Sequence, residues 1–298
     1  MELLPGWRLF NSVQLNRSIV HLLNEGELES VIGHELGHVF PYSPISSRCL
    51  LIHGLLSGTI SLLISHFLGG GGVGYFLVVG PVVGLAVART VAFSAWATQI
   101  RLVEFLCDDY AAQAAGFIPA MTSHMKLALE HEARTDLLLR VLEAKVRHAN
   151  VPIEDLMKDY DNALPFGGVE SEVARKQLED SLKRRMADTE QSSLKGFFNY
   201  VFKSDDVDED ELRNSIQKMR AIQQIAKVPV SIKDLLAIPG GPSLAQLGEL
   251  MSSLENNPNY VLAHLENEIG DWDSSHPNTT RRLLYLWRNR DAYQPVAG

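Results

Sequence analysis

The sequence predicts a mainly α-helical fold with little β-sheet, which carries an apolar helical hairpin. Three observations support this prediction. Apolar residues recur at helical spacing around His34 and around Glu104, two long apolar stretches lie within residues 50–96, and helical patterns fill the chain after Gly116. With 298 residues, of which 46% are apolar, the chain is long enough to bury a sizeable core.

The first expected helix covers residues 28–40. Apolar side chains at helical spacing indicate it, and Pro41 and Pro44 end it because proline cannot continue a helix. Gly33 and Gly37 lie inside it, although a glycine costs about 1 kcal/mol in a helix interior. Such glycines are tolerated where a backbone or a metal must approach closely.

This helix carries an H-E-x-x-H motif, in which the fixed positions are His34, Glu35 and His38. Residues four apart lie on the same face of a helix, so both imidazoles can reach one Zn²⁺ ion while Glu35 contacts its bound water. The motif therefore predicts a metal site with two histidine ligands. The alternative is an ordinary core helix whose two histidines have structural partners.

Two apolar stretches follow the motif. Residues 50–68 contain no formally charged side chain, and residues 73–96 contain only Arg89. Each stretch is close to the length that crosses about 30 Å of hydrocarbon, which predicts a transmembrane hairpin at residues 50–96. His53 and His66 interrupt the first stretch, so a buried helical hairpin in a soluble protein is the alternative.

The hairpin has to leave and return on the same side, because the segments before and after it are expected to meet at one metal. Arg48 and Arg101 flank its open end. Positively charged residues favour the cytosolic side of a membrane. We therefore expect an integral membrane protein whose metal site faces the cytosol or an equivalent compartment.

The stretch from residue 101 to residue 112 is expected to be a helix that carries the remaining metal ligand. Glu104 and Asp108 are four residues apart and so share one face. Glu104 can complete a site with two histidines and one glutamate, which leaves the fourth position for water, while Asp108 can accept the outer N–H of a ligating histidine. The alternative is a solvated acidic stripe on a surface helix.

After Gly116 the sequence predicts a series of helices. Residues 121–148 form one amphipathic helix or a pair of helices, and residues 150–226 are the most polar part of the chain. The acidic run at residues 205–211 lacks the glycine and ligand spacing of an EF-hand, and acids in the first turn of a helix explain it. Residues 239–242 are expected to form a turn before a helix that Ser243 caps.

Together these motifs resemble the gluzincin metallopeptidases of the HtpX and CAAX-prenyl-protease kind. The family's second motif is usually E-x-x-A-D-x-x-A, which Glu104, Asp108 and Ala111 match, while Cys107 replaces the usual alanine. A late His-Pro with an arginine five residues after the proline is also found near the active site of the family, and the stretch from His276 to Arg282 matches it. The resemblance covers residues 22–116 and 271–289.

The resemblance implies a zincin-like metallopeptidase domain with one Zn²⁺ per chain and a protein or peptide substrate. Zinc lowers the pKa of its bound water to about 7, and Glu35 acts as general base on that water. The developing oxyanion needs a donor, for which His276, or Arg282 close to it, is the candidate. For His276 the alternative is a structural role at the entry to a helix.

The expected domains follow from these assignments. They are a catalytic core at 1–116, a helical region at 117–298, a polar insertion at 150–226 and a segment at 271–290 that returns to the active site.

The N-terminal part departs from the family pattern. Family members usually have more transmembrane or strand-forming sequence before the H-E-x-x-H helix than this chain has before His34. Residues 12–15 and 18–23 could form a remnant of the strands on which an extended substrate pairs. We expect either a reduced sheet or a truncated gene product, and either would impair activity.

Two further functional classes stay open from the sequence. One is a zinc-binding relative that is catalytically inactive, and the other is a membrane scaffold or assembly protein in which the motif occurs by chance. A net charge of −9 argues against nucleic acid as a partner, whereas the apolar hairpin favours contact with a lipid bilayer.

Overall fold

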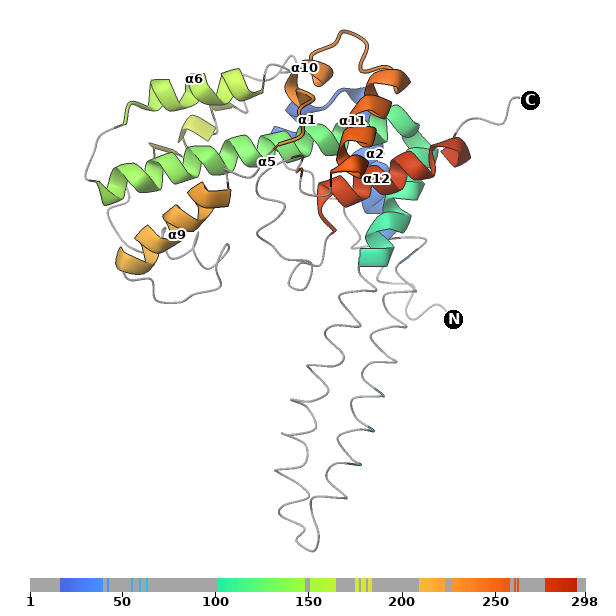
Figure 1. The fold of residues 1–298 in the computed structure, drawn as a ribbon, viewed down its shortest axis with the longest axis horizontal. Helices are drawn as coiled ribbons and strands as arrows, with labels where there is room; N and C mark the ends of the chain where they lie inside the picture. The colour runs from blue at the N-terminus through green and yellow to red at the C-terminus, as the bar shows by residue number, and fades with distance from the viewer. Residues whose placement is uncertain are drawn as a thin grey trace, which may run out of the picture. The chain divides into compact units, whose positions relative to one another are not determined.

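The structure is a computed structural model. It describes residues 17–39, 42, 55, 59, 63, 101–147, 151–164, 175–176, 178–180, 182–183, 209–222, 227–257, 260, 262 and 277–293. Over these ranges the protein is helical and has no β-strand, which confirms the prediction of a mainly α fold (Figure 1). The helices are α1 (Arg17–Leu22), α2 (Glu25–Val39), one at residues 101–115, α5 (Phe117–Val146), α6 (Ile153–Ala163), α9 (Glu209–Ile222), α10 (Ile232–Leu236), α11 (Leu244–Asn256), α12 (Thr279–Arg288) and the 3₁₀ helix η3 (Arg290–Tyr293).

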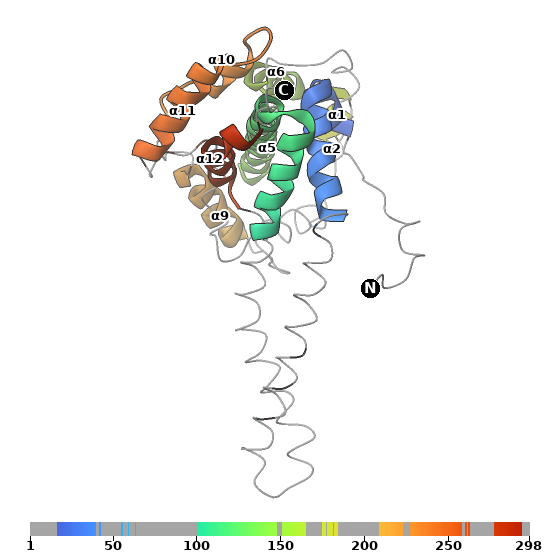
Figure 2. The ribbon, with the colours of Figure 1, turned by 90° about the vertical axis from the view of Figure 1, so that its right-hand side faces the viewer.

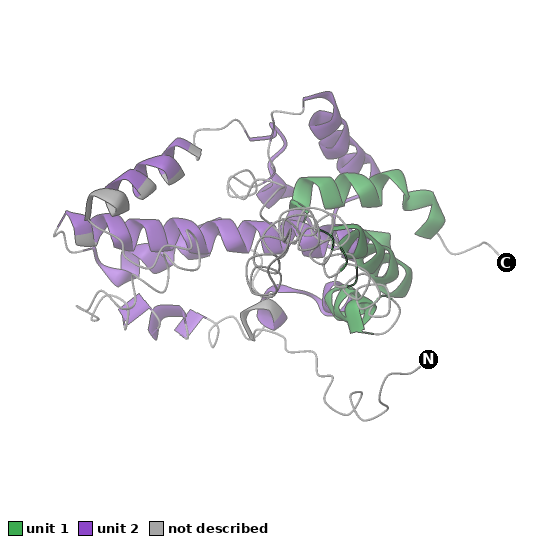
Figure 3. Ribbon diagram, turned by 90° about the horizontal axis from the view of Figure 1, so that it is seen from below, with its two compact units in different colours: residues 1–13, 29–117, 269–298 green, residues 14–28, 118–268 purple. Residues whose placement is uncertain are grey.

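The chain divides into two compact units (Figure 3). Unit 1 comprises Met1–Val13, Glu29–Phe117 and Ile269–Gly298, and unit 2 comprises Gln14–Leu28 and Ile118–Glu268. Unit 1 thus combines most of the H-E-x-x-H helix, the helix of residues 101–115 and the C-terminal segment.

The expectation of strand at residues 18–23 is wrong, because Arg17–Leu22 is the helix α1. A helix forms its backbone hydrogen bonds within itself, whereas a strand needs a neighbouring strand, and the described residues contain none. The other candidate strand, at residues 12–15, lies outside the described residues.

The helix α2 begins three residues earlier than the sequence pattern predicts. Asn24 Oδ1 accepts a hydrogen bond from the backbone N–H of Glu27 at 2.9 Å, and Glu27 Oε2 accepts one from the backbone N–H of Asn24 at 2.9 Å. This reciprocal cap satisfies two backbone donors at the helix start. Lys126 Nζ also donates to Glu27 Oε2 at 2.7 Å, so the capping carboxylate has a buried cationic partner within unit 2.

In unit 1, α2 and the helix of residues 101–115 lie side by side and run in opposite directions (Figure 2). A Cβ added at Gly33 would lie 3.3 Å from Ala111 Cα, and one added at Gly37 would lie 3.2 Å from Cys107 Cα. Both distances are shorter than an ordinary contact, so a side chain at either position would press against the facing helix. The close approach that the two glycines allow is therefore between two helix backbones.

The C-terminal helix α12 packs into unit 1 through Leu283 and Leu286, which are fully buried. Asn278 caps its start, since Asn278 Oδ1 accepts from the backbone N–H of Arg281 at 2.8 Å. The Phe117 ring lies 6.0 Å from the Trp287 ring and 6.4 Å from the Tyr293 ring, centroid to centroid. These contacts hold the C-terminal segment within the unit.

In unit 2, α5 is one continuous helix, which decides between the two predicted alternatives. Its C-terminal half contributes to a core of Leu137, Val141, Leu156, Met157 and Leu182. The predicted turn at residues 239–242 is confirmed, with Gly240 and Gly241 at φ of +85° and +86°, a conformation that favours glycine. Ser243 caps α11 as predicted and forms a capping box with Gln246.

No described helix combines the length and the apolar composition that crossing a membrane requires. The stretch predicted to form the hairpin, residues 50–96, lies outside the described residues except for Leu55, Thr59 and Leu63, which are helical and exposed. The transmembrane hairpin therefore stays a prediction.

Candidate metal centre

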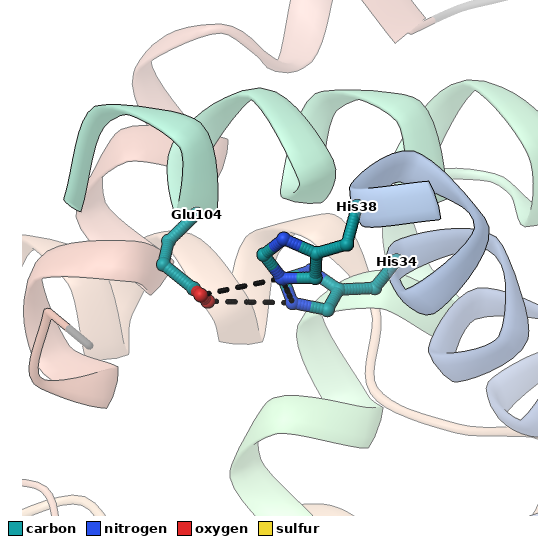
Figure 4. A group of neighbouring side chains, drawn as sticks. All are labelled: His34, His38 and Glu104. Carbon is teal, nitrogen blue, oxygen red and sulfur yellow. Dashed lines mark hydrogen bonds and ion pairs between the residues drawn. The ribbon is translucent and has the colours of Figure 1, made fainter. Parts of the chain in front are cut away.

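The motif residues His34 and His38 meet Glu104 in unit 1 (Figure 4). The two histidines project from consecutive turns of α2, and the glutamate projects from the helix of residues 101–115. Glu104 Oε2 lies 3.3 Å from His34 Nε2, and Glu104 Oε1 lies 3.2 Å from His38 Nε2. The ligand atoms of the three side chains all lie within 4.8 Å of one another.

The spacing of these atoms fits a tetrahedral zinc site. Zinc bonds to nitrogen and oxygen are about 2.0 to 2.1 Å long, which places neighbouring tetrahedral ligand atoms about 3.3 Å apart. The two Nε2 atoms are 3.2 Å apart, and each lies 3.2 to 3.3 Å from a Glu104 oxygen. Two imidazoles and one carboxylate are also a common zinc ligand set with an open fourth position.

Asp108 sets the orientation of the first histidine. His34 Nδ1 lies 2.9 Å from Asp108 Oδ1, and the aspartate side chain is fully buried. When Nδ1–H donates to this carboxylate, the neutral imidazole presents the lone pair of Nε2 towards Glu104 and His38. This is the tautomer that a metal ligand needs, so the contact predicted for Asp108 is present.

Arg282 of α12 forms a two-bond ion pair with the same aspartate. Arg282 Nε donates to Asp108 Oδ2 at 2.8 Å, and Nη2 donates to Oδ1 at 2.5 Å. Because His34 and Arg282 share Oδ1 as acceptor, Arg282 Nη2 comes within 3.3 Å of His34 Nδ1. That short distance between two donors is a consequence of their common partner and not a hydrogen bond of its own.

The charges around the site favour a cation. Glu104 and Asp108 have side-chain exposures of 1% and 0%, and Arg282, at 14%, supplies one positive charge against their two negative charges. Burial lowers the pKa of His34, but its hydrogen bonds to Asp108 and Glu104 outweigh that effect and leave the pKa above its usual value. A positive charge at the imidazole is thus stabilised, whether a proton or a metal supplies it.

The other predicted site residues differ in how far the structure places them. Glu35 is exposed on α2, next to His34 in the motif. His38, at 30% side-chain exposure, is the most open of the three candidate ligands, so solvent reaches the centre on its side. His276 lies outside the described residues, whereas the following Pro277 is buried.

One group near the centre was not predicted. Asp109 Oδ2 accepts a hydrogen bond from Tyr285 Oη at 2.6 Å, and Asp109 Oδ1 accepts one from Tyr293 Oη. The sequence contains two hints, since Asp109 directly follows Asp108 and Tyr285 lies one helical turn after Arg282. Neither hint names the partner, because these contacts join residues 176 and 184 positions apart.

The comparisons with known proteins agree with this geometry. The sequence profile of peptidase family M48 matches residues 5–288, nearly the whole chain. No curated protein and no solved structure matches the chain. The family match spans both segments that build the centre and the C-terminal segment that contacts it, and the chain belongs to peptidase family M48.

Proposed function

We propose that this protein is a zinc-dependent metalloendopeptidase in which His34, His38 and Glu104 hold one zinc ion. The observation that carries the proposal is the convergence of these three side chains, from two helices, at the separations of a tetrahedral zinc site. Membership of a metallopeptidase family points to the same chemistry. The substrate is then a protein or a peptide.

A zinc ion bound there would act as a Lewis acid and lower the pKa of a water at its open position to about 7. Glu35 would serve as the general base for that water and as the proton donor to the leaving amine, and its exposed place on α2 leaves it accessible. Asp108 keeps the Nδ1 proton of His34 and so holds the Nε2 lone pair at the ligand position.

The sequence left His276 and Arg282 as alternative donors to the developing oxyanion. Two nitrogens of Arg282 already donate to Asp108, and the third lies 3.8 Å from Glu104 Oε2. A guanidinium that is engaged in this way and 14% exposed has little left to offer a substrate. We therefore assign Arg282 to positioning Asp108 and propose His276 as the oxyanion donor.

Membrane association is a further part of the proposal. Leu55, Thr59 and Leu63 are the described residues of the predicted hairpin; they are helical, and the two leucines are 65% and 51% exposed. Thr59 Oγ1 donates to the backbone oxygen of Leu55 at 2.9 Å, so this polar group has a partner within its own helix. Exposed leucines beside a hydroxyl that is satisfied within its own helix suit a lipid environment.

The location can be measured in cells that express the full chain. An integral hairpin predicts that the protein remains with the membrane fraction after alkaline carbonate extraction. It also predicts that protease added to sealed vesicles cleaves the chain only when the cytosolic face is outside. Release by carbonate would contradict the hairpin without touching the metal site.

The reaction is tested by cleavage of unfolded casein by the full-length protein. Glu35→Gln removes the general base and should lower the cleavage rate at least a hundredfold, in line with the usual contribution of about 10² to 10⁴. Glu29→Gln makes the same change at an exposed position of the same helix and should leave the rate unchanged. Zinc binding without cleavage by the wild type would instead identify a catalytically inactive relative.

A further inference from the structure

The C-terminal segment of unit 1 contacts two adjacent carboxylates of the helix at residues 101–115. Arg282 binds Asp108 through two hydrogen bonds, and Tyr285 and Tyr293 both donate to Asp109. Asp108 holds the ligand His34, whereas Asp109 contacts neither histidine in any described interaction. The two carboxylates therefore fix different parts of the same segment.

The geometry of α12 makes the two contacts depend on each other. Arg282 and Tyr285 are three residues apart and so lie on one face of the helix, about one turn from each other. A rotation of α12 about its axis, or a slide along it, would move both side chains together. Contact with both Asp108 and Asp109 thus restricts α12 to one arrangement, in which Arg282 forms its paired bonds with Asp108.

We propose that Asp109, Tyr285 and Tyr293 act as positioning residues for the metal centre. They lock α12 and η3 in the arrangement that keeps Arg282 on Asp108, and through Asp108 they keep the Nε2 lone pair of His34 directed at the metal. This inference rests on the proposed function, because it assigns a task within the same metal site.

The state of the two phenols supports this role. Burial and the hydrogen bond to Asp109 raise the pKa of Tyr285 and of Tyr293 above the usual value, so both phenols keep their protons and remain donors at physiological pH. Tyr285 also packs against Phe105, at 4.8 Å between ring centroids. Phe105 directly follows the candidate ligand Glu104, so the tyrosine lies beside the turn that presents that ligand.

The test uses Co²⁺ as the probe, because its visible spectrum reports the arrangement of its ligands as well as its affinity. Metal-free wild type, Tyr285→Phe, Tyr293→Phe and the double variant are titrated with Co²⁺, and each is checked for folding by circular dichroism. Tyr160→Phe is the matched control, because Tyr160 Oη also donates to a carboxylate, that of Glu130 in unit 2, at 3.4 Å.

The double variant should bind Co²⁺ about tenfold more weakly, at the lower end of the usual loss when groups behind the metal ligands are removed. Its Co²⁺ spectrum should change, each single variant should show a smaller effect, and Tyr160→Phe should match the wild type. A folded double variant with wild-type affinity and spectrum would overturn the inference and leave the metal site standing. If the double variant does not fold, unchanged binding in both single variants would overturn it equally.

The same titration separates this inference from the proposed function. A wild-type protein that binds no Co²⁺ would overturn the metal site and the inference together. Binding that is weakened in the double variant but not in Tyr160→Phe would support the inference, whether or not the protein cleaves casein.

Discussion

The contact between α2 and the helix of residues 101–115 leads to a sharp prediction for Gly37→Ala. The new Cβ would lie 3.1 Å from Cys107 Sγ and 3.2 Å from both Cα and Cβ of Cys107, whereas ordinary contacts begin at 3.4 Å. The two helices must then separate by roughly 0.2 to 0.3 Å, since a helix backbone does not yield as a flexible side chain does.

This separation should affect stability less than it affects the metal. Overpacking costs about 1 to 3 kcal/mol, but alanine gains about 1 kcal/mol over glycine in a helix, so the free energy of unfolding should fall by only about 0 to 2 kcal/mol. Metal–ligand distances in zinc sites stay within about 0.2 Å of their usual values, and the separation of roughly 0.2 to 0.3 Å reaches or exceeds that limit. Moving Glu104 away from His34 and His38 by this amount should weaken zinc binding about tenfold, or about 1.4 kcal/mol.

The assay is zinc binding in competition with a chromophoric chelator, together with thermal unfolding of the metal-free protein. Gly33→Ala is the matched control, because its Cβ would lie 3.3 Å from Ala111 Cα and 3.5 Å from Ala114 Cβ, a milder contact on the same helix. Adding Cys107→Ala to Gly37→Ala should recover only part of the loss, since the backbone contact remains. A Gly37→Ala variant that binds zinc like the wild type and gains the full stability of an alanine would contradict this prediction.

Three further predictions follow from the environment of the centre. Asp108→Asn should weaken zinc binding about 10- to 100-fold in the same competition assay, because it loosens His34 and leaves the charge of Arg282 unbalanced; unchanged affinity would contradict this. Burial and the nearby Glu104 and Asp108 carboxylates raise the pKa of Cys107 to about 12. Mass spectrometry should therefore find this thiol unmodified after iodoacetamide treatment of the folded, metal-free protein near pH 8. Rapid alkylation would contradict this prediction. The raised pKa of His34 means that zinc must displace a proton as the solution becomes acidic. The zinc affinity should therefore decrease as the pH falls through that pKa. A zinc affinity that stays constant between about pH 5 and 8 would contradict this prediction.

The local parts of this fold and site could be predicted from the sequence because their signals are local. The positions of His34 and His38, and of Glu104 and Asp108, follow from one rule, that residues four apart share a helix face. Ser243 as a helix cap and the turn at residues 239–242 follow from the chemistry of single residues in the same way.

The parts that could not be predicted depend on contacts between distant segments. The sequence placed Arg282 near the active site through a resemblance, but its partner Asp108 lies 174 residues away and only the folded structure shows their paired bonds. Asp109 and its two phenols are hinted at only by their positions next to Asp108 and after Arg282, and neither hint names the partner. The early start of α2 is an exception, because the reciprocal cap between Asn24 and Glu27 is local. The Asn-x-x-Glu spacing indicates a helix start, which the spacing of apolar residues alone does not reveal.

The most direct test of the metal centre is the zinc content of the purified full-length protein and of Glu104→Gln, with Glu29→Gln as the matched control. We expect about one zinc per chain in the wild type and in the control, and almost none in Glu104→Gln, because a neutral amide replaces the carboxylate ligand. A wild type without zinc, or a Glu104→Gln variant that retains it, would contradict the proposed site.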